Sequence, residues 1–179
     1  VGSGDEVEVL RRMEEGIDDQ EEDERAITWI KENCPEGFDK NPEFIKKTPE
    51  QKERDWEFTV KTAIIVRDLM NGNDKLPEGC KEEAVGHNAI AAGFQGQRQW
   101  TDHYPNADFT ESILNTSFDW NGAREPYIVA TENDTLNGDS MHLMKLLTNR
   151  AQLFADVRTH WWGAAGKKAT GCDIEGRAL

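Results

Sequence analysis

The sequence is poor in basic side chains. Its 179 residues include 21 Lys and Arg against 35 Asp and Glu, which leaves a formal charge of −14. Affinity for phosphate backbones depends on basic side chains, so the composition argues against a nucleic acid as partner. The same charge argues against binding to an anionic membrane surface.

The chain also lacks long apolar runs and paired cysteines. No apolar run approaches the ~20 residues that a spanning helix needs, and residues 1–5 lack the apolar core of a signal peptide. Cys34, Cys80 and Cys172 are an odd number without CxxC spacing, which fits a reducing compartment better than a disulfide framework. We therefore expect a cytoplasmic protein.

What the chain does contain is large aromatic side chains and unevenly spread charge. Only 36% of its residues are hydrophobic, but six Trp and seven Phe supply enough apolar surface for a folded core. Residues 1–57 hold 19 acids and 9 bases, so −10 of the −14 lies there. The sequence predicts one folded domain with a strongly solvated N-terminal third.

Three helices are predicted before residue 72. The first covers 6–16, and the second starts at a cap on Asp18 or Asp19. The acidic run 21–24 would form the solvated first turn of that second helix. The third helix starts at Thr48 with Gln51 completing a capping box and ends at the stop signal 71–72, and its inner stripe is Trp56, Val60, Ala63, Ile64 and Met70.

From residue 80 onward, glycines, amides and aromatics are crowded together. Small residues let a ligand approach the backbone closely and amides form hydrogen bonds, so this composition indicates binding loops. A helix capped by Asp108, with Glu111 completing a capping box, is predicted to interrupt the region.

Residues 126–159 predict a βαβ unit. An apolar strand covers 127–131, a helix covers 136–148 and a second short strand covers 152–155. Glu132 and Asp156 directly follow the two strands, and the carboxyl ends of parallel strands meet at one edge, where ligands bind in open α/β sheets. Two carboxylates held together repel each other unless a proton or cation intervenes, so the spacing indicates a divalent-metal site.

The same spacing allows a second interpretation. One of the two acids would cap the following helix, and the other would pair with Arg158 or Arg124. From spacing alone the two interpretations are about even.

Four motifs resemble those of the L-fucose isomerase family. They are GFQGQRQWTD at 93–102, SFDWNG at 117–122, ATENDTLNG at 130–138 and FADVRT at 154–159. The resemblance implies an Mn²⁺-dependent enzyme that interconverts L-fucose and L-fuculose through an ene-diol, with some members accepting D-arabinose. It also implies a cytoplasmic homo-oligomer, typically a hexamer, with active sites at subunit contacts.

The resemblance assigns roles to three residues. Glu132 and Asp156 match the two metal-ligating carboxylates, which also serve as acid and base, and Gln95 matches a glutamine that lines the sugar site. The family's third metal ligand is a histidine in a C-terminal domain, and none of the four histidines here takes its place by motif. His160 lies just past Asp156 but is more easily understood as a surface residue.

The expected architecture is a three-layer α/β domain with a mainly parallel sheet, preceded by N-terminal helices. Residues 1–160 would be the middle domain of the enzyme, helical over 1–72 and motif-rich over 80–160. Residues 161–179 would begin the linker to a C-terminal domain, and the family's N- and C-terminal domains would be partners of this segment.

Two alternatives remain open. The chain as it stands would be a non-catalytic module that supplies half of a metal site and an oligomer contact. Otherwise the parent protein would be a related pentose isomerase, such as one for L-arabinose, although the flanking motifs match the fucose enzyme better.

Overall fold

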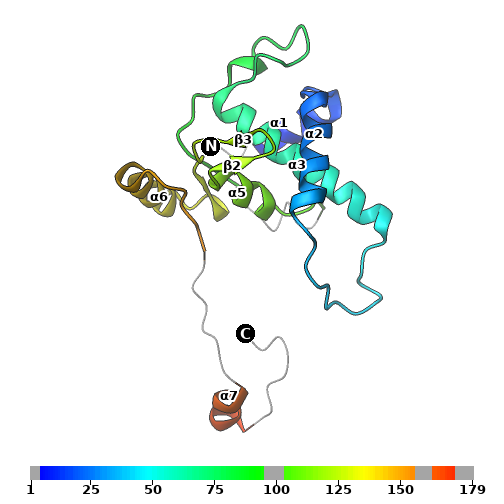
Figure 1. Ribbon diagram of the computed structural model, residues 1–179, viewed down its shortest axis with the longest axis vertical. Helices are drawn as coiled ribbons and strands as arrows, with labels where there is room; N and C mark the ends of the chain where they lie inside the picture. The colour runs from blue at the N-terminus through cyan, green and yellow to red at the C-terminus, as the bar shows by residue number, and fades with distance from the viewer. Residues whose placement is uncertain (1–4, 95–102, 156–162, 172–179) are drawn as a thin grey trace.

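The computed structural model describes residues 5–94, 103–155 and 163–171, and Figure 1 shows their arrangement. In chain order the helices and strands are α1 (Asp5–Glu15), α2 (Gln20–Asn33), α3 (Pro49–Asn71), η1 (Glu83–Val85), β1 (Ala92–Gly93), α5 (Asp108–Asn115), β2 (Phe118–Asp119), β3 (Gly122–Ala123), β4 (Val129–Ala130), η2 (Thr131–Asn133), α6 (Thr135–Thr148) and α7 (Gly163–Thr170). Among the described helices, none is long and apolar enough to cross a bilayer.

The caps of α2 and α3 confirm the predicted helix starts. Asp19 caps α2 by accepting a hydrogen bond from the Glu22 N–H at 3.2 Å. Thr48 and Gln51 form the predicted capping box, in which the Thr48 N–H donates to Gln51 at 2.9 Å and the Gln51 N–H donates to Thr48 at 3.3 Å. Since α3 ends at Asn71 before Gly72, its stop signal is confirmed as well.

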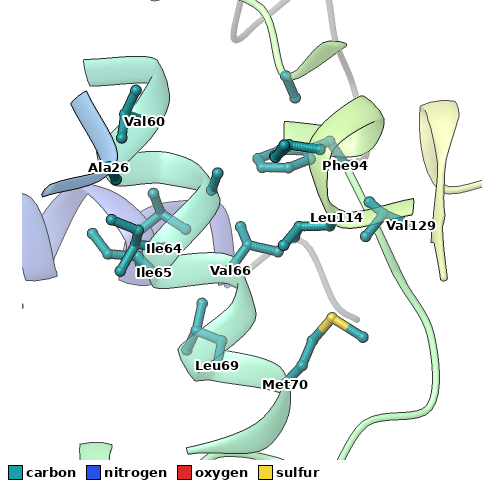
Figure 2. Close-up of a cluster of buried hydrophobic side chains, with 14 of the residues drawn as sticks. Ala26, Val60, Ile64, Ile65, Val66, Leu69, Met70, Phe94, Leu114 and Val129 are labelled. Carbon is teal, nitrogen blue, oxygen red and sulfur yellow. The ribbon is translucent and has the colours of Figure 1, made fainter. Parts of the chain in front are cut away.

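The core forms where α3 lies between α2 and α5. The predicted stripe is buried at Val60, Ala63, Ile64 and Met70, while Trp56 is half-buried and packs edge-on against Phe109 of α5. Figure 2 shows this cluster continuing from α3 through Leu114 of α5 to Val129 of β4. Each fully buried aliphatic side chain contributes about 1.5–3 kcal/mol to the free energy of folding. Because α3 supplies several of these side chains and packs against both α2 and α5, it joins the N-terminal helices to the strands.

Two residues of the acidic run at the start of α2, Glu22 and Asp23, are buried rather than solvated, which corrects the sequence prediction for them, whereas Glu21 and Glu24 are exposed as predicted. Glu22 is 5% exposed and Asp23 is 6% exposed, because α3 lies against this turn and supplies cations to it. Arg67 contacts Glu22 with both terminal nitrogens, one at 2.9 Å, and Asp68 at 2.7 Å. Trp120 donates at 2.7 Å to Glu22 Oε1, the oxygen that Arg67 Nη1 also contacts, so a motif from the second half of the chain completes the cluster.

Burial and this set of donors act in opposite directions on Glu22. Burial alone would raise the pKa of its carboxyl, but the Arg67 guanidinium, with hydrogen bonds from Trp120 and Asn121, lowers the pKa to about 2. The carboxylate therefore remains charged inside the fold.

A second buried carboxylate pair lies beside it. The Lys61 ammonium lies 2.5 Å from Asp18 and 3.3 Å from Asp23, both of which are buried. Burial, together with the neighbouring Asp18 charge and against the opposing effect of Lys61, raises the pKa of Asp23 to about 7. One ammonium thus serves two acids.

The strands confirm an α/β fold with N-terminal helices. β1 pairs in parallel with β4, and β2 pairs with β3 in an antiparallel hairpin. The described strands form two two-stranded sheets, so the three-layer arrangement stays a prediction.

The βαβ prediction is wrong in its second strand. Residues 151–155 form no strand, and Leu153 within them is 84% exposed, so this short apolar run does not enter the core. The parallel partner of β4 is instead β1, which comes earlier in the chain. The first strand and the helix of the predicted unit are confirmed by β4 and α6.

The predicted cap of α5 is also wrong. Ala107 occupies the cap position and makes no side-chain cap hydrogen bond, and Asp108 is the first residue of the helix. Glu111 does not close a capping box, because its carboxylate accepts a hydrogen bond from the Thr131 hydroxyl instead.

Candidate functional site

The candidate site lies at the carboxyl edge of the β1–β4 pair. Ala92 lies opposite Val129 and Gly93 opposite Ala130, and the Ala92 N–H donates to the Ile128 carbonyl at 2.9 Å. Because the two strands are parallel, the segments that follow them leave at the same edge. One of these segments leads to Gln95 and the other to Glu132.

Gly93 allows the two segments to come together. A Cβ on Gly93 would lie 2.6 Å from the Ala130 carbonyl oxygen and 2.8 Å from the Asn133 Cα, both of which are backbone atoms that cannot move aside. The first glycine of the 93–102 motif is therefore required for close packing against the turn that carries Glu132.

Glu132 adopts an unusual backbone conformation in this turn. Its φ is 57° and its ψ is 20°, and Asn133 follows with a φ of 54°. The left-handed region costs a residue with a Cβ about 1–2 kcal/mol, and such strain persists at functional sites where the surroundings hold it. The side chain of Glu132 is exposed at the strand edge.

The structure removes part of the alternative interpretation of the two acids. The cap of α6 is Asp134, which accepts from the Asn137 N–H at 3.1 Å, so Glu132 is not the capping acid. Arg124 contacts Asp119 at 2.5 Å and donates to the Ile113 carbonyl at the end of α5 at 2.7 Å. This arginine is thus occupied in holding the β2–β3 hairpin to α5.

Two of the predicted site residues cannot be placed. Gln95 and Asp156 lie outside the described residues, as does His160. The contact between Glu132 and Asp156 therefore stays a prediction.

Glu111 is a carboxylate near the site that the sequence analysis did not identify as part of it. It is 6% exposed and accepts a hydrogen bond from the hydroxyl of Thr131, the residue before Glu132. Burial raises the pKa of Glu111, and the charges of Asp108 and Glu132 raise it further, against the Thr131 hydrogen bond. The signal available in the sequence was spacing: Glu111 and Asn115 are four residues apart and therefore share one face of a short helix, beside the apolar residues that face inward.

A cavity of about 550 Å³ opens beside Glu111 and Thr131. Its polar lining includes Asp108, Asn115 and Gln152, and its apolar lining includes Phe154. Carboxylate, amide and hydroxyl groups with two aromatic rings, those of Phe118 and Phe154, are suited to a small polyhydroxylated molecule.

The described residues alone do not make a complete metal site. Within 5–94, 103–155 and 163–171 there is no group of three or more His, Cys, Asp or Glu side chains that could hold a metal ion. Glu132 presents the hard oxygen ligand that Mn²⁺ or Mg²⁺ prefers. A metal centre that includes Glu132 stays a prediction.

Comparison with known proteins identifies the family. Residues 1–149 match the family model described as "L-fucose isomerase, second N-terminal domain". The chain belongs to the L-fucose isomerase family. The proteins named L-fucose isomerase from Streptococcus pneumoniae TIGR4 and P1031 are each 59% identical to it over 177 residues, and that from strain 70585 is 58% identical.

The match to these L-fucose isomerases covers 98% of this chain but only 30% of each relative. The family model's description as a second N-terminal domain agrees with that proportion. The chain thus corresponds to one segment of the L-fucose isomerases that it resembles.

One L-fucose isomerase-like motif has a structural role and not the ligand-binding role that its composition indicated. In the 117–122 motif, Trp120 is 7% exposed and bonded to Glu22, and Asn121 donates to the same Glu22 oxygen at 2.7 Å. This motif binds α2 to the rest of the fold.

Proposed function

We propose that this chain is a segment of a full-length L-fucose isomerase and supplies one half of its metal and sugar site. The observation that carries the proposal is the turn after β4, where Glu132 is held in a left-handed conformation at the edge where the parallel strand β1 also ends. In a chain of this family, a strained turn at this position is best explained if the Glu132 carboxylate must face a ligand outside the domain.

Each residue has a role in the proposed reaction. Glu132 and Asp156 would hold a Mn²⁺ ion, and one of them would move the proton between C1 and C2 of the sugar through an ene-diol. Gln95 binds a sugar hydroxyl. When bound, the metal supplies a positive charge for the two oxygens that share the developing negative charge.

The cavity beside Glu111 supports a sugar as substrate. Its carboxylate, amide and hydroxyl lining adjoins Thr131, the residue before Glu132. A polyhydroxylated aldose therefore finds hydrogen-bond partners next to the proposed metal ligand. The third metal ligand, a histidine, would come from the C-terminal domain.

The proposal is tested by assaying the full-length protein for L-fucose isomerisation with Mn²⁺ and after treatment with a chelator. We expect turnover that is lost with the chelator and restored by Mn²⁺. L-arabinose serves as the competing substrate, and a preference for it would favour the pentose-isomerase alternative. Absence of metal-dependent turnover of either sugar would contradict the proposal.

The outer face of α6 supports the role of this segment as a module that docks onto other parts of the protein. Only Gly138 and Met141 of this helix are buried, and Figure 1 shows α6 beyond α5, away from α2 and α3. Its large apolar side chains are 51–80% exposed and are Leu136, Leu143, Met144, Leu146 and Leu147. So large an apolar face is typical of an interface, and we propose that the rest of the full-length polypeptide covers it.

Replacing Leu143 and Leu147 together by Ser is expected to have opposite effects in two contexts. In the isolated chain it should reduce self-association, because it removes exposed apolar surface. In the full-length protein it should lower the free energy of unfolding by about 2 kcal/mol per side chain, because a buried contact is lost. Light scattering and chemical denaturation measure the two effects.

The control for this pair is Asp139→Ser, an exposed polar position on the same helix, which should change neither property. An unchanged stability of the full-length double variant would show that the face remains exposed there. A change in its subunit number without a loss of stability would assign the face to a second copy instead. Hexameric assembly and a cytoplasmic location stay predictions.

A further inference from the structure

The strand that leads to Glu132 is held on its second edge by a side chain of α5. β4 pairs with β1 on one side, and on the other side the Asn115 side chain bonds the Val129 backbone twice. Its amide nitrogen donates to the Val129 carbonyl at 2.9 Å, and its oxygen accepts from the Val129 N–H at 2.8 Å. Asn115 thus satisfies the backbone groups that an edge strand would otherwise leave unpaired.

Glu111 extends this contact toward the site. It lies one helical turn before Asn115, a rise of about 6 Å along α5. Val129 and Thr131 are two residues apart, about 6.6 Å along an extended chain. The two spacings match, so Asn115 reaches Val129 while Glu111 reaches the Thr131 hydroxyl.

The burial of Glu111 has no explanation in packing alone. The side chain is 6% exposed, and among the described residues its Oε1 atom is buried without a hydrogen-bond partner. A buried carboxylate with one unsatisfied oxygen costs free energy that a leucine of similar size would not. Such a group needs a compensating role.

The turn beyond Thr131 needs support from its surroundings. Glu132 and Asn133 are both left-handed, and Gly93 packs against Asn133 on one side. On the other side Thr131 is held by Glu111. The strained turn is therefore fixed between β1 and α5.

We propose that Glu111 is a positioning residue for Glu132. Through the Thr131 hydroxyl it fixes the turn so that the Glu132 carboxylate points out from the strand edge in the orientation a metal ligand needs. The inference rests on the proposed function for its effect on metal and sugar, but the effect on the turn is independent of it.

The test uses Glu111→Leu and Glu111→Gln in the full-length protein, with Ile113→Ala as the matched control. Ile113 is buried on the same helix, so its truncation destabilises α5 without touching Thr131. Two measurements are made on each variant: amide hydrogen exchange of the segment 131–134, and Mn²⁺ affinity by titration.

We expect Glu111→Leu to speed exchange of the 131–134 amides and to weaken Mn²⁺ binding about 10- to 100-fold, as happens when partners that orient metal ligands are removed. Glu111→Gln keeps a hydrogen-bond acceptor and should restore most of both properties. Ile113→Ala should lower the melting temperature while leaving both close to wild type.

Unchanged exchange of 131–134 in Glu111→Leu would overturn the positioning role, whatever the protein binds. Equal weakening of Mn²⁺ binding by Ile113→Ala and Glu111→Leu would also overturn it, because the effect would then reflect general loss of stability. If Glu111→Leu loosens the turn but the wild-type protein binds no Mn²⁺, the proposed function fails and the positioning role stands.

Discussion

Glu132→Gln in the full-length protein is expected to lower kcat/KM for L-fucose by about 10³-fold, equivalent to about 4 kcal/mol of transition-state stabilisation. The substitution keeps the size of the side chain and removes its charge, so the turn should fold as before. What is lost is one anionic metal ligand and one candidate acid–base group. Initial-rate assays at saturating Mn²⁺ measure the change.

Glu125→Gln is the matched control for this substitution. The side chain of Glu125 is 86% exposed, and the Lys145 ammonium lies 3.7 Å from its carboxylate. Its substitution should leave kcat/KM within a factor of two of wild type. Wild-type turnover by Glu132→Gln would remove Glu132 from the site.

Glu22→Gln is expected to lower the free energy of unfolding of the chain by about 3 kcal/mol. Removing one partner of a buried ion pair is far more costly than removing an exposed one, because the other charge stays buried. Arg67 would keep Asp68, at 2.7 Å, as an anionic partner and would lose the charge of Glu22. Chemical denaturation at pH 7 measures the difference, and the exposed neighbour Glu24→Gln should change it by less than about 0.5 kcal/mol.

The same substitution should alter the response to acid. The pKa of Glu22 is lowered from 4.5 to about 2, so its contribution to stability is present above pH 4.5 and is lost as the pH falls toward 2. The difference in stability between wild type and Glu22→Gln should therefore shrink over that interval. A cost below about 1 kcal/mol at pH 7 would show that the cluster of Glu22, Arg67 and Trp120 adds little to the fold.

The helices could be predicted because their signals are local. Thr48 and Gln51 cap α3, and Asp19 caps α2, through side chains within three residues of the groups that they bond. The three- to four-residue spacing of apolar residues along α3 likewise reflects contacts on one face of one helix. Local hydrogen bonding and periodicity determine these elements in the sequence itself.

The burial of Glu22 could not be predicted, because its partners are far away in the chain. Arg67 lies 45 residues later and Trp120 lies 98 residues later. Without these distant partners, an acidic first turn is expected to lie in solvent. The run of charges was interpreted by its local composition, but long-range pairing decides its burial.

The candidate site was predicted in part. The position of Glu132 after a buried strand followed from the apolar run before it, and β4 confirms that strand. The partner strand was assigned to 152–155 because it too is a short apolar run, whereas the true partner β1 is a pair of small residues, Ala92 and Gly93. Small side chains are needed in β1 because the backbones approach each other closely there. A search for hydrophobic runs does not detect such a strand.

Binding of Mn²⁺ to the full-length protein and to its Glu132→Gln variant, titrated by electron paramagnetic resonance, tests most directly whether Glu132 is half of a metal centre. Free and bound Mn²⁺ are distinguished without any assay of the reaction. We predict one tight site per chain in the wild type and a loss of affinity of at least about 100-fold in the variant. Equal affinity and stoichiometry in the two proteins would contradict the account.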